Sequence, residues 1–167
     1  MSKKLIAFYS RNGENYFGGA MREVEVGNTK IAAQILQQMT DADLFEIEQV
    51  TPYSRHYKEC VAQAVADSKS NARPKLVHDI ETEEYETIYL GYPNYCGTMP
   101  MAVWTFLEAH NFKGKIIKPF CTNEGSGMGR SEADLARLCP TARIGKGLSI
   151  KGSAAADSRT AFTSWIS

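Results

Sequence analysis

The sequence lacks the clusters of cysteine and histidine that build a metal centre or a disulfide framework. It contains neither a CxxC pair nor a metal-ligand spacing, so we expect no metal site and no thioredoxin-like dithiol. Thiols this far apart suit a reducing compartment, and a cytoplasmic location is therefore expected. The isolated residues are Cys60, Cys96, Cys121, Cys139, His56, His78 and His110.

The sequence also lacks an excess of charge of one sign. Lys+Arg and Asp+Glu number 19 each, so the formal net charge is zero and no basic surplus points to nucleic acid. The apolar runs are too short to span a bilayer, and Met-Ser-Lys-Lys leads directly into a predicted strand rather than a signal-peptide core. We therefore expect neither a nucleic-acid partner nor a membrane partner.

What remains is the pattern of an ordinary globular chain of 167 residues, 43% hydrophobic and 23% charged. We expect residues 1–167 to form a single domain. Five apolar runs with strand character alternate with five stretches of helical periodicity. The predicted strands are residues 5–9, 43–50, 87–92, 116–121 and 147–151, and the predicted helices are residues 28–39, 54–72, 101–109, 131–138 and 154–166.

Strands and helices that alternate at this spacing predict an α/β fold, a doubly wound five-stranded parallel sheet with helices on both faces. In such sheets a ligand binds beyond the carboxyl ends of the strands, where the strand order reverses. Three loops rich in small polar residues follow the first, third and fourth predicted strands. They converge only if those strands are neighbours, so we expect the strand order 2-1-3-4-5.

The first of these loops has the composition of a phosphate cradle. Residues 10–13 (Ser-Arg-Asn-Gly) end the strand, and residues 27–29 (Gly-Asn-Thr) stand where the helix would be capped. Free N–H groups and the positive end of the helix dipole would face an anion there. Such units are common and most bind nothing, so this loop alone leaves phosphate binding open. The absence of GxxxxGK[ST] and GxGxxG argues against the nucleoside-triphosphate and dinucleotide fingerprints.

An insertion, residues 14–26, separates the two halves of the first loop. It is too long for a tight turn, and its residues 21–26 have the character of a short hairpin arm. If the loop binds a ligand, the insertion is placed to cover it. The alternative, a decoration of the surface, is equally compatible with the sequence.

The other two polar loops differ in composition from the first. Residues 93–100 (Pro-Asn-Tyr-Cys-Gly-Thr-Met-Pro) combine proline, glycine and an aromatic residue, as in a rigid wall around a flat ligand. Residues 122–129 (Thr-Asn-Glu-Gly-Ser-Gly-Met-Gly) are small and polar, and Ser131 is expected to cap the helix that follows. All three loops together indicate one ligand site better than any one of them does.

With these loops, nearly the whole chain resembles the flavodoxin family, specifically the branch with an interrupted phosphate loop. Residues 9–13 (Tyr-Ser-Arg-Asn-Gly) and 27–29 (Gly-Asn-Thr) resemble the two ends of the family's Ser/Thr-x-Thr-Gly-Asn-Thr loop. Residues 91–100 are similar to the loop that walls the isoalloxazine ring, and residues 122–127 to the loop at its pyrimidine edge. The resemblance implies a flavodoxin-like three-layer sandwich and flavin mononucleotide (FMN) as the cofactor.

The resemblance also implies a cofactor site with no catalytic residue and no metal. Ser10, Asn12, Asn28 and Thr29 would hold the phosphate, while Arg11 either adds charge or points to solvent. The full set of implied cofactor-binding residues is Ser10, Arg11, Asn12, Asn28, Thr29, Pro93, Asn94, Tyr95, Cys96, Gly97, Thr122, Asn123, Glu124, Gly125, Ser126 and Gly127.

Three of these residues are expected to affect the flavin ring. Tyr95 would stack on it, a contact worth about 0.5–1.5 kcal/mol beyond area burial, where many relatives have tryptophan. Cys96 is either a packed spectator or a reactive thiol. Glu124 either lies near the ring and lowers its potential or turns outward to solvent. In the family, a backbone peptide of the second loop reorients when the flavin is protonated, and here the Cys96–Gly97 peptide would do so because glycine tolerates both conformations.

The sequence favours an FMN-containing, low-potential electron carrier, because it shows no acid–base pair and no second substrate motif. Its partners would be redox proteins or a small electron acceptor. One alternative is an FMN-dependent NAD(P)H:quinone-type oxidoreductase, with Tyr16 and Phe17 of the insertion shaping a substrate pocket. Another is a flavin-free binding or regulatory module on the same fold, since fold does not fix function.

Overall fold

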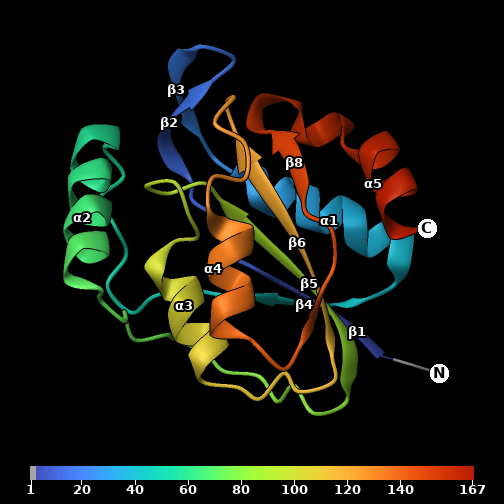
Figure 1. The fold of residues 1–167 in the computed structure, drawn as a ribbon. Coiled ribbons are helices and arrows are strands. Elements are labelled where there is room, and N and C mark those ends of the chain that lie inside the picture. Colours follow the sequence, from blue (N-terminus) through green and yellow to red (C-terminus); the bar gives the residue numbers. More distant parts are fainter. Residues whose placement is uncertain (1–2) are drawn as a thin grey trace.

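A six-stranded parallel sheet forms the centre of the computed structural model, which describes residues 3–167 (Figure 1). The strands follow the order β4-β1-β5-β6-β7, and β8 also pairs with β6. The predicted order 2-1-3-4-5 is therefore confirmed. The bounds are β1 (Lys3–Phe8), β4 (Asp43–Glu46), β5 (Tyr85–Pro93), β6 (Ile116–Asn123), β7 (Arg143–Ile144) and β8 (Leu148–Lys151).

The predicted fifth strand is divided into two pieces, β7 and β8. Residue Arg143 of β7 lies beside Ile116, while Leu148 of β8 lies beside Phe120, so both pieces pair with successive lengths of β6. Two glycines, Gly145 and Gly147, lie in the break between them. Strand β7 has two residues, which is too short for an alternating pattern to predict.

Helices cover both faces of the sheet and complete a three-layer sandwich (Figure 1). Helices α1 (Asn28–Thr40) and α5 (Arg159–Ile166) pack on one face, and α3 (Met101–Glu108) and α4 (Ser131–Leu138) pack on the other. Helix α2 (Tyr57–Ser70) lies at the side of α3 that faces away from α4 and is shorter than predicted. The predicted closing helix begins as a separate 3-10 turn, η1 (Gly152–Asp157).

Alternate residues of β1 supply the two halves of the core. Leu5 and Ala7 pack in the layer of α3 and α4, while Ile6 and Phe8 pack in the layer of α1 and α5. All four side chains are buried. Because a central parallel strand is covered on both faces, it is apolar throughout rather than alternating.

The insertion in the first loop is a complete β-hairpin, longer than the predicted arm. Strands β2 (Gly13–Phe17) and β3 (Ala20–Val24) pair antiparallel. The two residues between them, Gly18 and Gly19, both have positive φ, as a type I′ turn requires. The hairpin projects from the edge of the sheet where β5 and β6 end (Figure 1). Among residues 3–167, no helix combines the length and the apolar character needed to cross a membrane.

One close contact in the core gives a stability prediction. A Cβ atom on Gly91 would lie 2.3 Å from Cζ of the buried Phe120 ring. We expect Gly91→Ala to lower the free energy of unfolding by about 1–3 kcal/mol, measured by urea denaturation, because the core is overpacked there. The added cost should be smaller in a Phe120→Leu background, which makes room for the methyl group. Equal costs in both backgrounds would contradict this explanation.

Candidate functional site

A cavity of about 500 Å³ opens at the carboxyl ends of β5 and β6 and at the N-terminus of α1. Its volume is in the range of small-molecule sites. Segments from all three polar loops meet there. The predicted site residues that line it are Arg11, Asn28, Thr29, Pro93, Asn94, Tyr95, Cys96, Thr122, Asn123, Glu124 and Ser126.

The N-terminus of α1 is capped by a residue distant in sequence. Gly27 occupies the N-cap position and has no side chain to offer, and the hydroxyl oxygen of Ser10 accepts a hydrogen bond from the Lys30 N–H at 3.0 Å. A Cβ atom on Gly27 would lie 2.1 Å from the Ser10 hydroxyl oxygen. Ser10 therefore closes the interrupted loop. Together with Asn12 it lines a second groove of about 540 Å³ rather than the cavity.

The first turn of α1 forms a polar end of the cavity. The N–H groups of Asn28 and Thr29 have no acceptor within the helix, because they belong to its first two residues. Asn28 is 8% exposed, and its Oδ1 atom has no hydrogen-bond partner. The hydroxyl groups of Thr29 and Thr122 are 2.7 Å apart and join α1 to the end of β6. This end of the cavity has the donors and the helix dipole that suit an anion.

The guanidinium group of Arg11 forms hydrogen bonds with backbone carbonyl groups of the protein. It donates hydrogen bonds to the backbone carbonyl of Glu14, to that of Ser54 at 3.1 Å and to that of Arg55 at 2.9 Å. These contacts tie the base of the hairpin to the segment before α2. The side chain lines the cavity, but its terminal nitrogen atoms are committed to carbonyl groups.

The second loop forms a tight turn at the wall of the cavity. Tyr95 and Thr98 exchange two backbone hydrogen bonds, of 2.8 and 3.0 Å. Between them Cys96 and Gly97 have φ values of 56° and 80°, as in a type I′ turn. The amide of Asn94 supports the turn because its Oδ1 accepts from the Gly97 N–H at 3.0 Å. Gly97 shapes the turn but does not line the cavity.

Tyr95 lines the cavity with its ring packed among other tyrosines. Its ring meets that of Tyr9 edge-on at 5.8 Å between centroids and lies 6.4 Å from that of Tyr53. The hydroxyl oxygen is buried and has no hydrogen-bond partner. Burial raises the pKa of Tyr95 well above its ordinary value, so the side chain stays neutral at physiological pH.

The third loop is ordered by its own side chains. Oδ1 of Asn123 accepts from the N–H groups of Gly125 and Gly127, each at 3.0 Å. These two glycines shape the loop and do not line the cavity. Glu124 lines it, but its carboxylate accepts from the Gly18 N–H at 3.1 Å and from the Ser153 hydroxyl at 3.3 Å. Glu124 thus connects the tip of the hairpin to the third loop and to η1.

The cavity has one wall that sequence reasoning missed. Its residues come from α2 and the hairpin, and the apolar residues of α2 have the same helical spacing as those of a helix that packs on a core. Partial exposure separates this stripe from the core, since Val61 is 42% exposed. The rings of Tyr16 and Tyr57 meet edge-on at 5.0 Å and join the hairpin to α2. The missed lining residues are Asn15, Tyr16, Tyr57, Cys60, Val61, Ala64, Val65 and Gly152.

The four cysteines differ in accessibility. Cys96 is exposed at the cavity, whereas Cys60, Cys121 and Cys139 are buried. Burial raises the pKa of Cys121 to about 12 and that of Cys139 to about 11, so both remain unreactive thiols. In the described part of the chain, no three His, Cys, Asp or Glu side chains gather in a way that could hold a metal ion.

The sequence and the fold were compared with those of known proteins. A family model described as Flavodoxin matches residues 21–167. A solved structure from Bacteroides uniformis ATCC 8492, provisionally described as a flavoprotein, is 27% identical with a TM-score of 0.74, and the match covers 99% of this chain and 97% of that one. A second such structure, from Bacteroides eggerthii DSM 20697, is 25% identical with a TM-score of 0.73, over 100% and 99% of the two chains.

A more distant structure has the same fold with a bound cofactor. It is a flavoprotein from Lactobacillus acidophilus NCFM in complex with FMN, 17% identical with a TM-score of 0.70, and the match covers 100% of both chains. At this identity the likeness supports the fold alone. No curated protein matches the sequence.

The position of Glu124 gives a prediction about the hairpin. We expect Glu124→Ala to speed hydrogen exchange at the Gly18 amide, measured by NMR, because this amide loses its acceptor. Glu124→Gln keeps an amide oxygen at the same place and should exchange nearly as the unmodified protein does. The effect on global stability should stay within about 1 kcal/mol, since both contacts are exposed. An unchanged Gly18 amide in the alanine variant would show that Glu124 does not hold the hairpin.

Proposed function

The chain belongs to the flavodoxin family, and we propose that it binds FMN in the cavity and acts as an electron carrier. The observation that supports this most is the convergence of three polar loops on one cavity at the carboxyl edge of the sheet. This is where open α/β sheets bind their ligands. Family membership fixes the fold, and the role rests on the chemistry of the site.

The polar end of the cavity fits a phosphate group. Asn28 and Thr29 offer backbone N–H donors at a helix N-terminus, and the Thr122 hydroxyl lies beside them. Because Gly152 has no side chain, its backbone can lie close to the Asn28 side chain. A Cβ atom on Gly152 would lie 2.5 Å from Nδ2 of Asn28. The unpartnered Oδ1 of Asn28 would accept from a hydroxyl group of the ribityl chain. These residues would hold the phosphate and orient the chain attached to it.

The rest of the cavity fits a flat aromatic ring system. Residues 93–96 and the apolar side of α2 line the same cavity, so a ring there would contact side chains of both segments. Pro93 and Tyr95 of the second loop and Val61 and Val65 of α2 all contribute to this lining. When bound, FMN supplies reversible uptake of electrons, while the protein binds it, orients it and limits its contact with water.

The residues around the cavity favour a carrier over an enzyme. Glu124 is the carboxylate among its lining residues in the described chain, and its oxygens already accept two hydrogen bonds. Neither a histidine nor a second carboxylate lines the cavity beside it, so an acid–base pair is missing there. Electron transfer requires no such pair, because the cofactor carries the chemistry.

A second candidate function is an FMN-dependent oxidoreductase that uses a nicotinamide donor and a quinone-type acceptor. The observation that favours it is the wall formed by Tyr16 and Tyr57, which partly covers the cavity with the hairpin. Aromatic residues in this position would contact a planar substrate laid over the flavin. Rapid bleaching of the bound flavin by NADH or NADPH would favour this candidate over the carrier.

The proposal predicts a preference for the phosphorylated flavin. We expect the flavin-free protein to bind one FMN and to bind riboflavin on the order of 100-fold more weakly, by fluorescence titration, because riboflavin lacks the charged acceptor. Asn28→Asp has nearly the same shape but adds a negative charge at this end. It should weaken FMN binding about ten-fold and leave riboflavin binding unchanged. Equal affinity for both flavins would contradict the assignment of the polar end.

Cys96 gives a second test, with a pH dependence. Burial raises the pKa of Cys96, although the neighbouring Arg130 lowers it in part, so the thiol form predominates at pH 7. Because the thiolate is the nucleophile, alkylation by iodoacetamide should speed up about ten-fold between pH 7 and pH 8. FMN should slow this reaction by covering the cavity, and Cys96→Ser should abolish fast labelling. A rate that does not respond to FMN would argue against binding there.

A further inference from the structure

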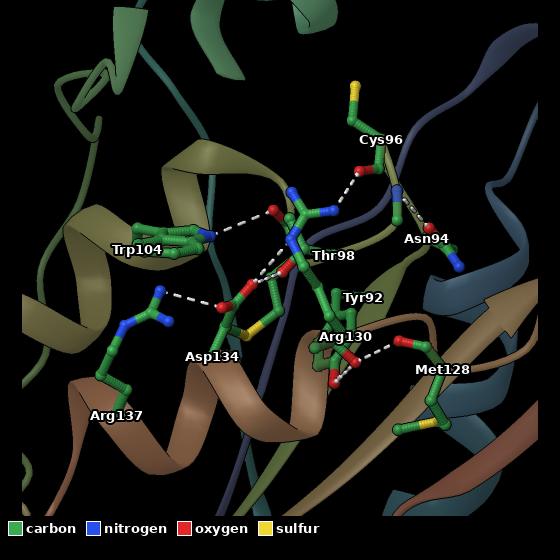
Figure 2. Close-up of polar contacts among 12 residues, drawn as sticks. Tyr92, Asn94, Cys96, Thr98, Trp104, Met128, Arg130, Asp134 and Arg137 are labelled. Carbon is green, nitrogen blue, oxygen red and sulfur yellow. Dashed lines mark hydrogen bonds and ion pairs between the residues drawn. The ribbon is translucent and has the colours of Figure 1, made fainter. Parts of the chain in front are cut away.

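The turn at the cavity wall is held by the residues just before α4, which do not line the cavity. The Arg130 backbone N–H donates to the Gly97 carbonyl at 2.7 Å, and its guanidinium Nη1 donates to the Cys96 carbonyl at 3.2 Å (Figure 2). The backbones also approach closely, since a Cβ atom on Gly129 would lie 2.2 Å from the Gly97 carbonyl oxygen. Two successive carbonyl groups of the turn are thus bound to one residue.

Arg130 is itself held by a buried carboxylate. Asp134 is 3% exposed, and its Oδ2 lies 3.5 Å from Nε of Arg130 and accepts from the Thr98 hydroxyl at 2.6 Å. Its other oxygen accepts from Arg137 at 2.9 Å. Asp134 therefore connects the far end of the turn to the guanidinium group that holds its centre (Figure 2). Arg137 shares the carboxylate but has no hydrogen bond to the turn, which makes it a natural control.

These contacts occupy both ends of the Cys96–Gly97 peptide. Its carbonyl oxygen accepts from Arg130, and its N–H donates to the Asn94 side chain at 3.0 Å. Arg130 does not line the cavity, whereas Cys96 and Asn94 do. The carbonyl group is therefore directed to α4, and at this peptide the turn offers the cavity no backbone acceptor. The Cys96 side chain points away from Arg130 (Figure 2).

We propose that Arg130 is a positioning residue that fixes the orientation of the Cys96–Gly97 peptide and so sets the reduction potential of a flavin beside it. The inference rests on the proposed function. A bound flavin would offer a ring nitrogen that accepts a hydrogen bond when oxidised and would donate one through N–H when reduced. A carbonyl group held by Arg130 cannot accept from that donor without losing a charge-assisted hydrogen bond. Arg130 thus disfavours the reduced form relative to the oxidised form.

The direction in which an Arg130 variant shifts the reduction potential distinguishes release of the peptide from the simple loss of a positive charge. Removing a positive charge near the flavin should make reduction harder, because a nearby cation favours the electron-rich form. Releasing the peptide should make reduction easier, because the freed carbonyl can turn to the flavin, and Gly97 tolerates the change. Arg130→Gln is therefore expected to shift the reduction equilibrium on the order of three- to ten-fold toward the reduced form. The bond is exposed, which keeps the effect modest.

The experiment compares Arg130→Gln, Arg130→Lys and the control Arg137→Gln. In FMN-loaded protein, midpoint potentials are measured by spectroelectrochemistry. We expect a shift toward the reduced form for Arg130→Gln, a smaller one for Arg130→Lys, which keeps a charged donor, and none for Arg137→Gln. A shift in the opposite direction, or equal shifts for Arg130→Gln and Arg137→Gln, would overturn the proposal.

A second measurement uses the flavin-free protein and does not depend on cofactor binding. Hydrogen exchange at the Gly97 amide should be faster in Arg130→Gln than in the unmodified protein, and unchanged in Arg137→Gln, because only the first variant frees the peptide. An unchanged Gly97 amide in Arg130→Gln would contradict the positioning role even if potentials shift. Failure of the unmodified protein to bind FMN would refute the proposed function, while the exchange data would still test the hold on the turn.

Discussion

The contact between the first strand and the first helix is the constraint on which the cavity depends. The chain leaves this point after Asn12 and returns at Gly27, and the Ser10 hydroxyl binds the Lys30 N–H across the gap. Gly27 has no room for a side chain there. The hairpin of β2 and β3 leaves the chain and returns to it beside this hydrogen bond. Its insertion therefore does not move α1 away from β6. The free N–H groups of α1 and the end of β6 then remain side by side, joined by Thr29 and Thr122.

The walls of the cavity come from distant segments, and each is fixed by a different contact. Arg11 ties the base of the hairpin to the segment before α2 through backbone carbonyls. Glu124 ties the tip of the hairpin to the third loop. The second loop depends on α4, since Arg130 and Asp134 hold its turn. The shape of the cavity therefore also depends on residues that do not line it, such as Arg130 and Asp134.

The sequence was sufficient for the strand order and for the convergence of the loops, although the predicted fifth strand is divided into β7 and β8. Apolar runs such as residues 87–92 are buried on both faces, so their composition directly reflects their position. The polar loops follow neighbouring strands, and strand order alone brings them together. Ser131 was expected to cap α4, but its hydroxyl donates to the Met128 carbonyl and caps no free N–H of the helix. Arg130 occupies the N-cap position instead, so the expected cap was wrong by one residue.

Other features of the site leave no pattern in the sequence. The apolar residues of α2 have the same periodicity whether they face a core or a cavity, so spacing alone does not assign Val61 and Val65 to the cavity. The roles of Ser10 and Arg130 depend on contacts to backbone atoms 20 and 34 residues away. Side-chain contacts to remote backbone groups follow from the folded geometry and not from local spacing.

The most direct test of this account is to map FMN binding on the flavin-free protein by backbone amide chemical shifts in NMR. We expect the largest changes at Asn28 and Thr29, in the turn around Cys96 and in the loop around Ser126. The groove lined by Ser10 and Asn12 should change little. Changes concentrated in that groove, or no changes at saturating FMN, would contradict the claim that the cavity is the cofactor site.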